Sequence, residues 1–401
     1  MHNGNGGKSP SPLHVLFGSG DRMAIGRGLA ELRAGRPVMI VGVDDSREVA
    51  LLALPAENLQ HASLEAFREL VTPSRLRLIL SARRASAIGH DSREAMRLDL
   101  PEAIGASAIR DLVEAPVVTS RLRGGLASAL EHAGVRLMKV AQLLPALLVA
   151  EVPSERVSAM SRLAVQVDPS ALDRFLAEAP SSLSIVSEAV IPLESGGRAR
   201  FVVFRDGLGE TATAVVVGNP DRSRPVPVRI HSACLTGDVF GSRRCDCGEQ
   251  LRLALARLRE IGGGIVLYLP QEGRGLGLAN KMRAYALQDT GLDTTDANMM
   301  LGFDDDERDY RIAARMLQLL GCRQVLLLTN NPAKLEGLAR AGIDLAGRMP
   351  LEAAINADNR RYMMAKAERA GHQLEALAAD GAVLAKGSTA SVSTLVAATT
   401  E

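Results

Sequence analysis

Three cysteines, Cys234, Cys245 and Cys247, fall within fourteen residues, and the chain holds only one other cysteine. Three thiolates fill three corners of a zinc tetrahedron and leave the fourth for water or substrate. Polar residues such as His231 and Asp238 crowd the same stretch, which a purely structural zinc knuckle would not need. The pattern favours an open, catalytic zinc site. A closed knuckle completed by a distant ligand and unrelated buried cysteines are the alternatives.

Three later loops combine polar residues with glycine or proline where a strand is expected to end. In residues 271–277, Glu272 can accept hydrogen bonds from a guanine-like edge, and Arg274 offers a planar fork for phosphate or carbonyl oxygens. In residues 304–309, Arg308 stands among acids, and Asp306 can handle a proton. Residues 329–334 enter a helix, where backbone N–H groups and Lys334 suit an anion. Ordinary glycine turns, helix capping and an Asn-Pro turn are the alternative interpretations.

Lys281 and Tyr285 lie four residues apart in an expected helix, so they share one face. A solvated lysine and a half-buried tyrosine would explain the pair equally well. Taken with the three loops and the cysteines, the pattern indicates a nucleotide held beside an open zinc site. Hydrolytic opening of a purine ring fits that combination. The His-x-Glu signature of zinc deaminases is missing from the sequence.

The elements that must position these residues indicate an α/β (α+β) fold with a mixed sheet and surrounding helices. We expect an antiparallel meander over residues 183–192, 199–206 and 211–217. Helices are expected over 249–261, 278–287, 307–320 and 333–341, with strands at 264–269, 324–329 and 343–345. Before them, the pattern predicts helices at 26–33, 64–70, 126–132 and 171–177 and a buried strand at 37–43, within a second α/β domain.

Composition excludes several classes of protein. Lys plus Arg number 47 and Asp plus Glu 46, so we expect no nucleic-acid or membrane partner. Clustered thiols are typical of metal ligands in a reducing compartment, and the first residues lack an apolar signal core. We therefore expect a cytoplasmic protein whose tails, residues 1–12 and 377–401, are flexible.

Five motifs resemble GTP cyclohydrolase II in order and spacing: HSACLTGD from His231, RCDCGEQL from Arg244, QEGRGLGL from Gln271, KMRAYALQD from Lys281 and LTNNPAK from Leu328. The resemblance covers residues 181–376. It implies conversion of GTP to formate, pyrophosphate and 2,5-diamino-6-(5-phosphoribosylamino)pyrimidin-4(3H)-one, the first step of riboflavin biosynthesis. It also implies a homodimer.

The resemblance implies a role for each matching position. Zinc would bind Cys234, Cys245 and Cys247, and magnesium would accompany the triphosphate. Asp306 matches a proposed general base, and Tyr285 a residue of the ring-opening step. Arg308 matches a proposed nucleophile toward the α-phosphate, although stabilising charge there suits a guanidinium better. The positions that match GTP contacts are Arg229, Ile230, His231, Ser232, Ala233, Gln250, Glu272, Gly273, Arg274, Thr294, Thr329 and Lys334.

The sequence departs from the family pattern at three positions. Many relatives carry Glu where Ala233 stands, Arg where Pro270 stands and Glu where Asp296 stands. Ala233 removes a carboxylate next to a zinc cysteine. A divergent cyclohydrolase, acting on another nucleotide or stopping at a formamido intermediate, is therefore one alternative. A non-catalytic zinc-containing nucleotide-binding regulator is another.

Residues 20–43, especially ELRAGRPVMIV from Glu31, are similar to the start of 3,4-dihydroxy-2-butanone-4-phosphate synthase. That family needs an acidic loop and a His-Thr-Glu segment to bind magnesium. Here the loop reads VDDSREVAL from Val43, and no His-Thr-Glu occurs. We therefore expect a degenerate, catalytically silent synthase-like domain at residues 13–180, followed by the cyclohydrolase domain at 181–376.

Overall fold

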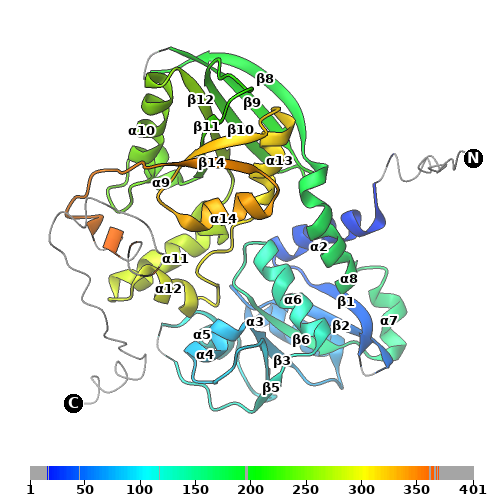
Figure 1. Cartoon of the computed structure of the whole chain (residues 1–401). Helices are drawn as coiled ribbons and strands as arrows, with labels where there is room; N and C mark the ends of the chain where they lie inside the picture. The colour runs from blue at the N-terminus through cyan, green and yellow to red at the C-terminus, as the bar shows by residue number, and fades with distance from the viewer. Residues whose placement is uncertain are drawn as a thin grey trace, which may run out of the picture.

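The computed structural model describes residues 18–360 apart from 45, 117, 195 and 196, and also residues 16, 363, 364, 367 and 369. The tails expected at 1–12 and 377–401 lie outside the described residues. Two seven-stranded sheets, each with helices around it, follow one another along the chain (Figure 1). The predicted α/β class with a mixed sheet is confirmed. We call residues 18–182 the N-terminal part and residues 184–360 the C-terminal part.

The sheet of the N-terminal part has the order β5-β4-β3-β6-β2-β1-β7. It is mixed, because β1 pairs antiparallel with β2 and parallel with β7. The buried strand expected at 37–43 is β1, which is buried from Val38 to Ile40 but exposed at Val43. The strands are β1 (Val38–Asp44), β2 (Arg47–Pro55), β3 (Arg77–Leu80), β4 (Met96–Asp99), β5 (Gly124–Leu126), β6 (Ala146–Glu151) and β7 (Gln166–Val167).

The helices of the N-terminal part are α2 (Gly20–Arg33), α3 (His61–Val71), α4 (Ala82–Ala87), α5 (Ala106–Glu114), α6 (Ala129–Val140), α7 (Ser154–Met160) and α8 (Pro169–Glu178), followed by the 3₁₀ turn η1 (Ala179–Ser182). The helix expected at residues 126–132 is wrong at its start. Leu126 ends β5, and a capping box between Ser128 and Glu131 begins α6 three residues later. The helix then continues to Val140, which brings Lys139 to the boundary with the C-terminal part.

The sheet of the C-terminal part has the order β14-β13-β11-β12-β10-β9-β8. The expected meander is confirmed, with β8, β9 and β10 antiparallel. Strands β11, β12, β13 and β14 run parallel, so β11, β12 and β13 end at one edge of the sheet. The strands are β8 (Ser184–Pro192), β9 (Arg198–Arg205), β10 (Thr211–Gly218), β11 (Val226–Ser232), β12 (Gly263–Leu269), β13 (Gln324–Leu328) and β14 (Asp344–Met349).

The helices of the C-terminal part are α9 (Leu235–Asp238), α10 (Cys247–Glu260), the 3₁₀ turn η2 (Glu272–Gly275), α11 (Leu278–Asp289), α12 (Thr294–Met300), α13 (Arg311–Leu319) and α14 (Pro332–Arg340). The helix predicted over 307–320 is wrong at its start, because α13 begins at Arg311. Asp306 and Asp309 accept hydrogen bonds from the backbone N–H groups of Arg308 and Arg311. Such local bonds compete with the first helical turn and keep residues 301–310, the α12–α13 loop, non-helical.

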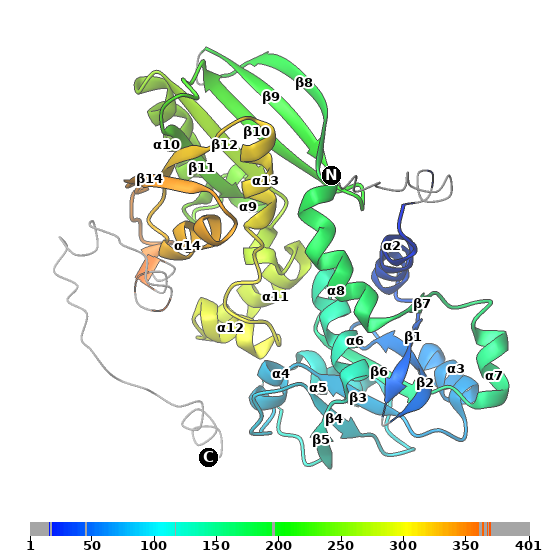
Figure 2. The ribbon, with the colours of Figure 1, turned by 45° about the vertical axis from the view of Figure 1, so that its right-hand side comes forward.

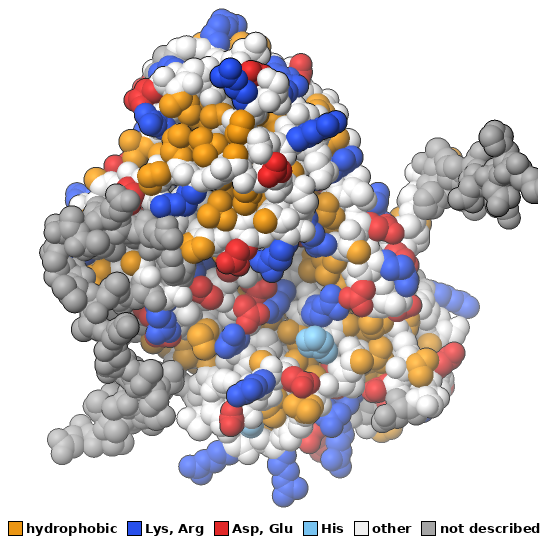
Figure 3. Space-filling view, viewed as in Figure 1, with side chains coloured by type: hydrophobic (Ala, Val, Ile, Leu, Met, Phe, Trp, Pro, Cys, Tyr) orange, Lys and Arg blue, Asp and Glu red, His pale blue; other side chains and the backbone are white. Residues whose placement is uncertain are grey.

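Helices α11 and α12 lie between the second sheet and the N-terminal part in both ribbon views (Figures 1 and 2). Leu287, Leu301 and Phe303 belong to the same buried apolar cluster as Leu78 and Leu144. Acidic and basic side chains mingle on the surface at this level (Figure 3). The two parts therefore share a hydrophobic core below a polar rim. Among the described helices, none has the length and apolar character to cross a membrane.

Candidate active site

The predicted site residues gather where the parallel strands β11, β12 and β13 end. Such carboxyl edges are the usual binding position in sheets of parallel strands, because the loops that follow the strands converge there. A cavity opens at this edge. The residues proposed from sequence that line it are Arg229, His231, Ser232, Ala233, Cys234, Cys245, Cys247, Gln250, Glu272, Gly273, Arg274, Tyr285, Thr294, Arg308, Thr329 and Lys334.

Two proposed residues do not line the cavity. Ile230 is fully buried in the core of the sheet, and its backbone oxygen accepts a hydrogen bond of 2.8 Å from Nζ of Lys334. Its side chain thus supports the floor of the site. Asp306 lies behind Arg308, and its carboxylate accepts hydrogen bonds of 2.7 and 2.5 Å from that guanidinium. Each of the two residues therefore contacts a neighbour that does face the cavity.

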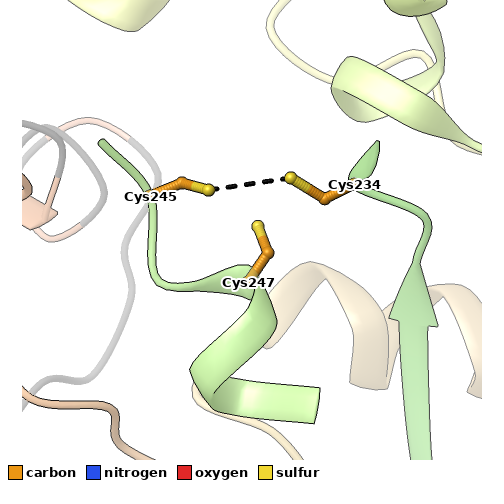
Figure 4. Close-up of side chains that lie close together, drawn as sticks. All are labelled: Cys234, Cys245 and Cys247. Carbon is orange, nitrogen blue, oxygen red and sulfur yellow. Dashed lines mark hydrogen bonds between the residues drawn. The ribbon is translucent and has the colours of Figure 1, made fainter. Parts of the chain in front are cut away.

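The three clustered cysteines point at one another from two elements (Figure 4). Cys234 precedes α9, while Cys245 and Cys247 lie at the start of α10. All three sulfur atoms lie within 4.8 Å of one another, and Sγ of Cys234 is 3.6 Å from Sγ of Cys245. Zn–S bonds of about 2.3 Å at tetrahedral angles place two sulfurs roughly 3.8 Å apart. The triad thus fits a zinc ion.

Gly237 completes the cradle around the sulfurs. A Cβ atom at this position would lie 2.9 Å from Sγ of Cys245 and 3.1 Å from Sγ of Cys234. Among the described residues, no fourth Cys, His, Asp or Glu joins the triad. Three ligands with one open corner are typical of catalytic zinc.

Lys281 approaches the triad from α11. Its ammonium donates to Sγ of Cys234 at 3.0 Å and to Oε1 of Glu272 at 2.7 Å. Hydrogen bonds from Cys245, Cys247 and Lys281 lower the pKa of Cys234, which favours its thiolate. Facing that thiolate, Cys245 and Cys247 have raised pKa values. The cluster therefore already holds one negative sulfur, next to a fixed cation.

A buried polar network of His231, Asp238 and Tyr268 contacts the backbone of Cys234. Nε2 of His231 lies 3.0 Å from Oδ1 of Asp238, and the hydroxyl of Tyr268 donates to Oδ2 of Asp238 at 2.9 Å. The same carboxylate accepts the backbone N–H of Cys234 at 2.9 Å. Burial lowers the pKa of His231 despite its acidic neighbour, which favours the neutral ring. This network fixes the backbone of the first cysteine.

Three cations also line the cavity. The guanidinium of Arg229 donates to the backbone oxygen of Leu328 at 3.0 Å and to Gln250. Arg308 and Lys334 line the same space. Burial lowers the pKa of Arg229, yet a guanidinium remains charged at neutral pH because its ordinary pKa exceeds about 12. Three cations in one buried cavity suit a polyanion such as a triphosphate.

Tyr285 lines the cavity from α11. The guanidinium carbon of Arg244 sits 4.4 Å from the centre of its ring, and Nη2 of Arg244 donates to its backbone oxygen at 3.0 Å. Burial raises the pKa of Tyr285, so its phenol stays protonated. The predicted face shared with Lys281 is confirmed, since both side chains reach the cavity.

Sequence reasoning missed several lining residues. Gln288 follows Tyr285 by three residues on α11, so helical periodicity could have found it. Asn298 lies on α12, a helix that was not expected. Tyr268 does not line the cavity, but it reaches Asp238 beside the triad because it pairs in register with His231 on the neighbouring parallel strand. No local spacing relates those two residues. The remaining lining residues not singled out as contacts are Gln271, Leu276, Ala284, Asn330, Asn331 and Leu351.

Comparison with known proteins agrees with this geometry. A family model described as GTP cyclohydrolase II matches residues 184–350. The chain is 39% identical over 372 residues to GTP cyclohydrolase-2 of Xylella fastidiosa (strain 9a5c), covering 91% of this chain and 92% of that protein. It is 47% identical over 195 residues to the riboflavin biosynthesis protein RibBA of Porphyromonas gingivalis, which covers 48% of each chain.

Among solved structures, the chain is similar to RibBX, a two-domain 3,4-dihydroxy-2-butanone 4-phosphate synthase from A. baumannii. The identity is 16% and the TM-score 0.32, with 82% of this chain and 99% of that chain covered. The near full-length match to the Xylella protein decides the assignment. The chain belongs to the GTP cyclohydrolase II family.

Proposed function

We propose that the protein is a zinc-dependent enzyme that hydrolyses GTP to 2,5-diamino-6-(5-phosphoribosylamino)pyrimidin-4(3H)-one, formate and pyrophosphate, in riboflavin biosynthesis. The observation that carries this proposal is one cavity that holds both the cysteine triad and three cations. Ring opening at C8 needs a hydrolytic centre, and release of pyrophosphate needs an anion site. Membership of the GTP cyclohydrolase II family supports the same assignment.

The triad and its neighbours would serve the base end of the nucleotide. When bound, zinc supplies a Lewis acid that activates water at the purine C8. Glu272 holds Lys281 through Oε1 and the backbone N–H of Leu235 through Oε2. Its two oxygens offer about four lone-pair sites, so it can still accept hydrogen bonds from a guanine N–H and NH₂ edge. The protonated phenol of Tyr285 can donate a hydrogen bond or proton as the ring opens.

The cations would serve the phosphate end, with magnesium on the triphosphate. Arg229 and Lys334 bind phosphate oxygens, and Arg308 stabilises charge that develops at the α-phosphate. A guanidinium is a poor nucleophile because it stays protonated at neutral pH, so electrostatic stabilisation is the role that suits Arg308 better. Burial opposes ionisation of Asp306, but hydrogen bonds from Arg308 outweigh it and lower the pKa of Asp306. Asp306 is therefore ionised at neutral pH.

The test is incubation of purified protein with GTP and magnesium, following formate, pyrophosphate and the pyrimidine by mass spectrometry. Formate and pyrophosphate in equal amounts, both abolished when zinc is removed, are the expected result. Formate without pyrophosphate would instead support the divergent cyclohydrolase that stops early, a course that Ala233 makes conceivable. Tight GTP binding without any product would support the regulator.

A Cys245→Ser variant separates the enzyme from the regulator. If the triad is only a structural metal site that stabilises the fold, its loss should unfold the C-terminal part. If it is an open catalytic site, turnover should be lost while the protein stays folded. The presence of Asp306, Arg308 and Tyr285 around the cavity supports the enzyme, because a sensor needs phosphate contacts but no base beside the metal.

We also propose that the N-terminal part is a degenerate synthase domain without activity, with its boundary near residue 180. Among the described residues, the cysteine triad is the only group of three or more Cys, His, Asp or Glu side chains close enough to hold a metal. In the N-terminal part, Arg47 of the loop VDDSREVAL pairs with Glu151, with Nη2 to Oε2 at 2.9 Å. Butanone phosphate made from ribulose 5-phosphate, and absent from a Glu48→Ala variant, would contradict this proposal.

A cytoplasmic homodimer completes the proposal. Strand β8 is exposed along its whole length at the edge of the second sheet, with Ile185, Val190 and Ile191 each more than 40% exposed. An apolar edge strand of this kind is normally covered, because its free backbone groups and side chains invite pairing. Light scattering of the purified protein should give twice the chain mass. A monomer at micromolar concentration would count against the dimer.

A further inference from the structure

The α12–α13 loop carries Asp306 and Arg308, yet much of what holds it comes from the N-terminal part. Nζ of Lys139, near the end of α6, donates to Oδ2 of Asp304 at 2.8 Å and to Oε1 of Glu307 at 2.6 Å. These two acids flank Asp306 on both sides. Lys139 is about a fifth exposed, as is Glu307, so solvent screens this contact less than a surface ion pair.

Helix α4 holds the start of the same loop. Nε of Arg83 donates to the second oxygen of Asp304 at 3.0 Å. The hydroxyl of Ser81 donates to the backbone oxygen of Gly302 at 2.6 Å. Nη1 of Arg84 donates to the backbone oxygen of Met300 at 2.8 Å. Phe303 then inserts its ring into the shared apolar cluster, where it is 1% exposed.

The C-terminal part holds the loop from the opposite side. Nη1 of Arg274 donates to Oδ1 of Asp305 at 2.7 Å, and the backbone N–H of Glu307 donates to the backbone oxygen of Arg274 at 3.1 Å. Arg274 itself lines the cavity. Asp306 and Arg308 therefore stand on a short segment fixed between two bodies, with Lys139 bridging the residues on either side of Asp306.

We propose that Lys139 is a positioning residue for the reaction, and that the N-terminal part is kept because it fixes the α12–α13 loop. This inference rests on the proposed function. Lys139 touches neither the cavity nor the cysteines. It acts by holding Asp304 and Glu307, so that Asp306 and Arg308 meet the α-phosphate in one geometry. A catalytic group displaced by about 1 Å can lose as much as a hundredfold in rate.

The position of the contact predicts which kinetic constant changes. Arg229 and Lys334 belong to β11 and α14 and not to the loop, so they continue to bind the triphosphate when the loop loosens. Loss of Lys139 should therefore lower kcat while KM changes little. A merely destabilising substitution would reduce the amount of folded enzyme and leave both constants of the folded fraction unchanged.

The test compares three full-length variants with wild type. Lys139→Met removes the charge and keeps the length of the side chain, and Lys139→Arg keeps the charge. Arg136→Met is the matched control, because Arg136 lies one turn earlier on α6 and pairs with Asp173 at 2.7 Å instead of with the loop. We expect kcat of Lys139→Met to fall about tenfold or more, with KM within about threefold. Lys139→Arg should recover most of the rate, and Arg136→Met should match wild type.

Amide hydrogen exchange of the loop without GTP gives a readout that does not depend on turnover. Exchange across residues 303–309 should become about tenfold faster in Lys139→Met and stay unchanged in Arg136→Met. Unchanged exchange together with unchanged kcat in Lys139→Met would overturn the inference. So would an equal fall in kcat in Arg136→Met. If wild type releases no formate or pyrophosphate, the proposed function fails, while the exchange experiment still decides whether Lys139 holds the loop.

Discussion

At the scale of single residues, the ion pair between Asp306 and Arg308 links the proposed base to the phosphate end of the site. The pair is intact in the structure, with 2.7 and 2.5 Å between the carboxylate and the guanidinium. A triphosphate that binds Arg308 would compete with Asp306 for the same donors. Binding of the nucleotide should therefore release the carboxylate for proton transfer at the moment it is needed.

Asp306→Asn tests this coupling. We expect kcat to fall by about a hundredfold or more, because the amide cannot accept the proton. GTP affinity should be unchanged or higher, since Arg308 loses its competing partner. Steady-state kinetics and calorimetric titration with GTP measure the two effects. Asp309→Asn is the control, because Asp309 lies in the same loop but pairs with the exposed Arg311 at 2.6 Å. A fall in GTP affinity with unchanged kcat would contradict the assignment.

Gly237→Ala tests the cradle around the sulfurs. The added methyl group would meet two of the three ligand sulfurs at 2.9 and 3.1 Å, closer than ordinary contacts. We expect zinc binding to weaken by about tenfold or more. Competition with a chromophoric chelator measures it. Gly20→Ala, where nothing lies within 4 Å of the added atom, should retain the affinity of wild type. Equal zinc affinity in the two variants would contradict the requirement for glycine at position 237.

At the scale of elements, the contact between α6 and the α12–α13 loop has a defined dependence on pH. Burial opposes the charge on each partner, yet their mutual hydrogen bonds prevail. The pKa of Asp304 is lowered and that of Lys139 is raised. An acid whose pKa is lowered on folding stabilises the folded state at pH values above its unfolded-state pKa. This stabilisation is lost as the pH falls through its folded-state pKa. A lysine whose pKa is raised on folding stabilises the folded state at pH values below its unfolded-state pKa. This stabilisation is lost as the pH rises through its folded-state pKa.

The stability contributed by Lys139 should therefore be constant between about pH 5 and pH 9 and shrink below about pH 4. It is measured as the difference in unfolding free energy between wild type and Lys139→Met in urea at each pH. The same difference for Arg136→Met, which involves Asp173 instead of Asp304, serves as the reference. A Lys139 contribution that grows as the pH falls below about 5 would have the opposite sign and would contradict the ion pair as its source.

Strand order is the element-scale feature that assembles the site. Local patterns predicted the meander, the helix after the cysteines and the strands at 264–269 and 324–329, and the structure confirms them. Helix α12 was missed because its sequence, TTDANMM, mixes polar residues with weak helix formers and shows no clear apolar stripe. Its start depends instead on Asp293, whose side chain accepts the backbone N–H of Asp296.

At the scale of the whole molecule, buried polar side chains join the two parts as well as apolar contacts, and Arg84 is one of them. Arg84 is 1% exposed and lies on α4. It donates to the backbone oxygens of Asp111, Leu112 and Ala115 in the N-terminal part and of Met300 in the C-terminal part. Burial lowers the pKa of Arg84 to about 10, so it remains charged at neutral pH.

Arg84→Met should lower the free energy of unfolding by roughly 2–4 kcal/mol, because several buried carbonyl groups lose their donor. Urea denaturation followed by circular dichroism measures the change. Arg224→Met is the control, since the side chain of Arg224 is 83% exposed and pairs with Asp221 at 3.7 Å. That variant should differ from wild type by about 0.5 kcal/mol or less. Equal stabilities would mean that the two parts do not depend on this contact.

The chemistry of the candidate site could be predicted from the sequence because its key groups are local. Cys245 and Cys247 lie two residues apart, and Cys234 precedes them by one loop, so their spacing already indicates a metal. Asp306 and Arg308, or Glu272 and Arg274, are likewise neighbours whose types indicate proton transfer and phosphate binding. The spacing of residues that are close in sequence indicates which side chains can act together, even before the fold is known.

Long-range placement could not be predicted in this way. Parallel pairing of β11 with β12 sets Tyr268 beside His231, and packing of α6 on the α12–α13 loop sets Lys139 between Asp304 and Glu307. These pairs are separated by many residues, and their contact depends on sheet order and on a core shared by the two parts. The sequence indicates a metal and a nucleotide site, whereas folding supplies the neighbours that hold its groups in place. Burial and hydrogen bonding between distant segments are the physical reason, because neither has a signature in local spacing.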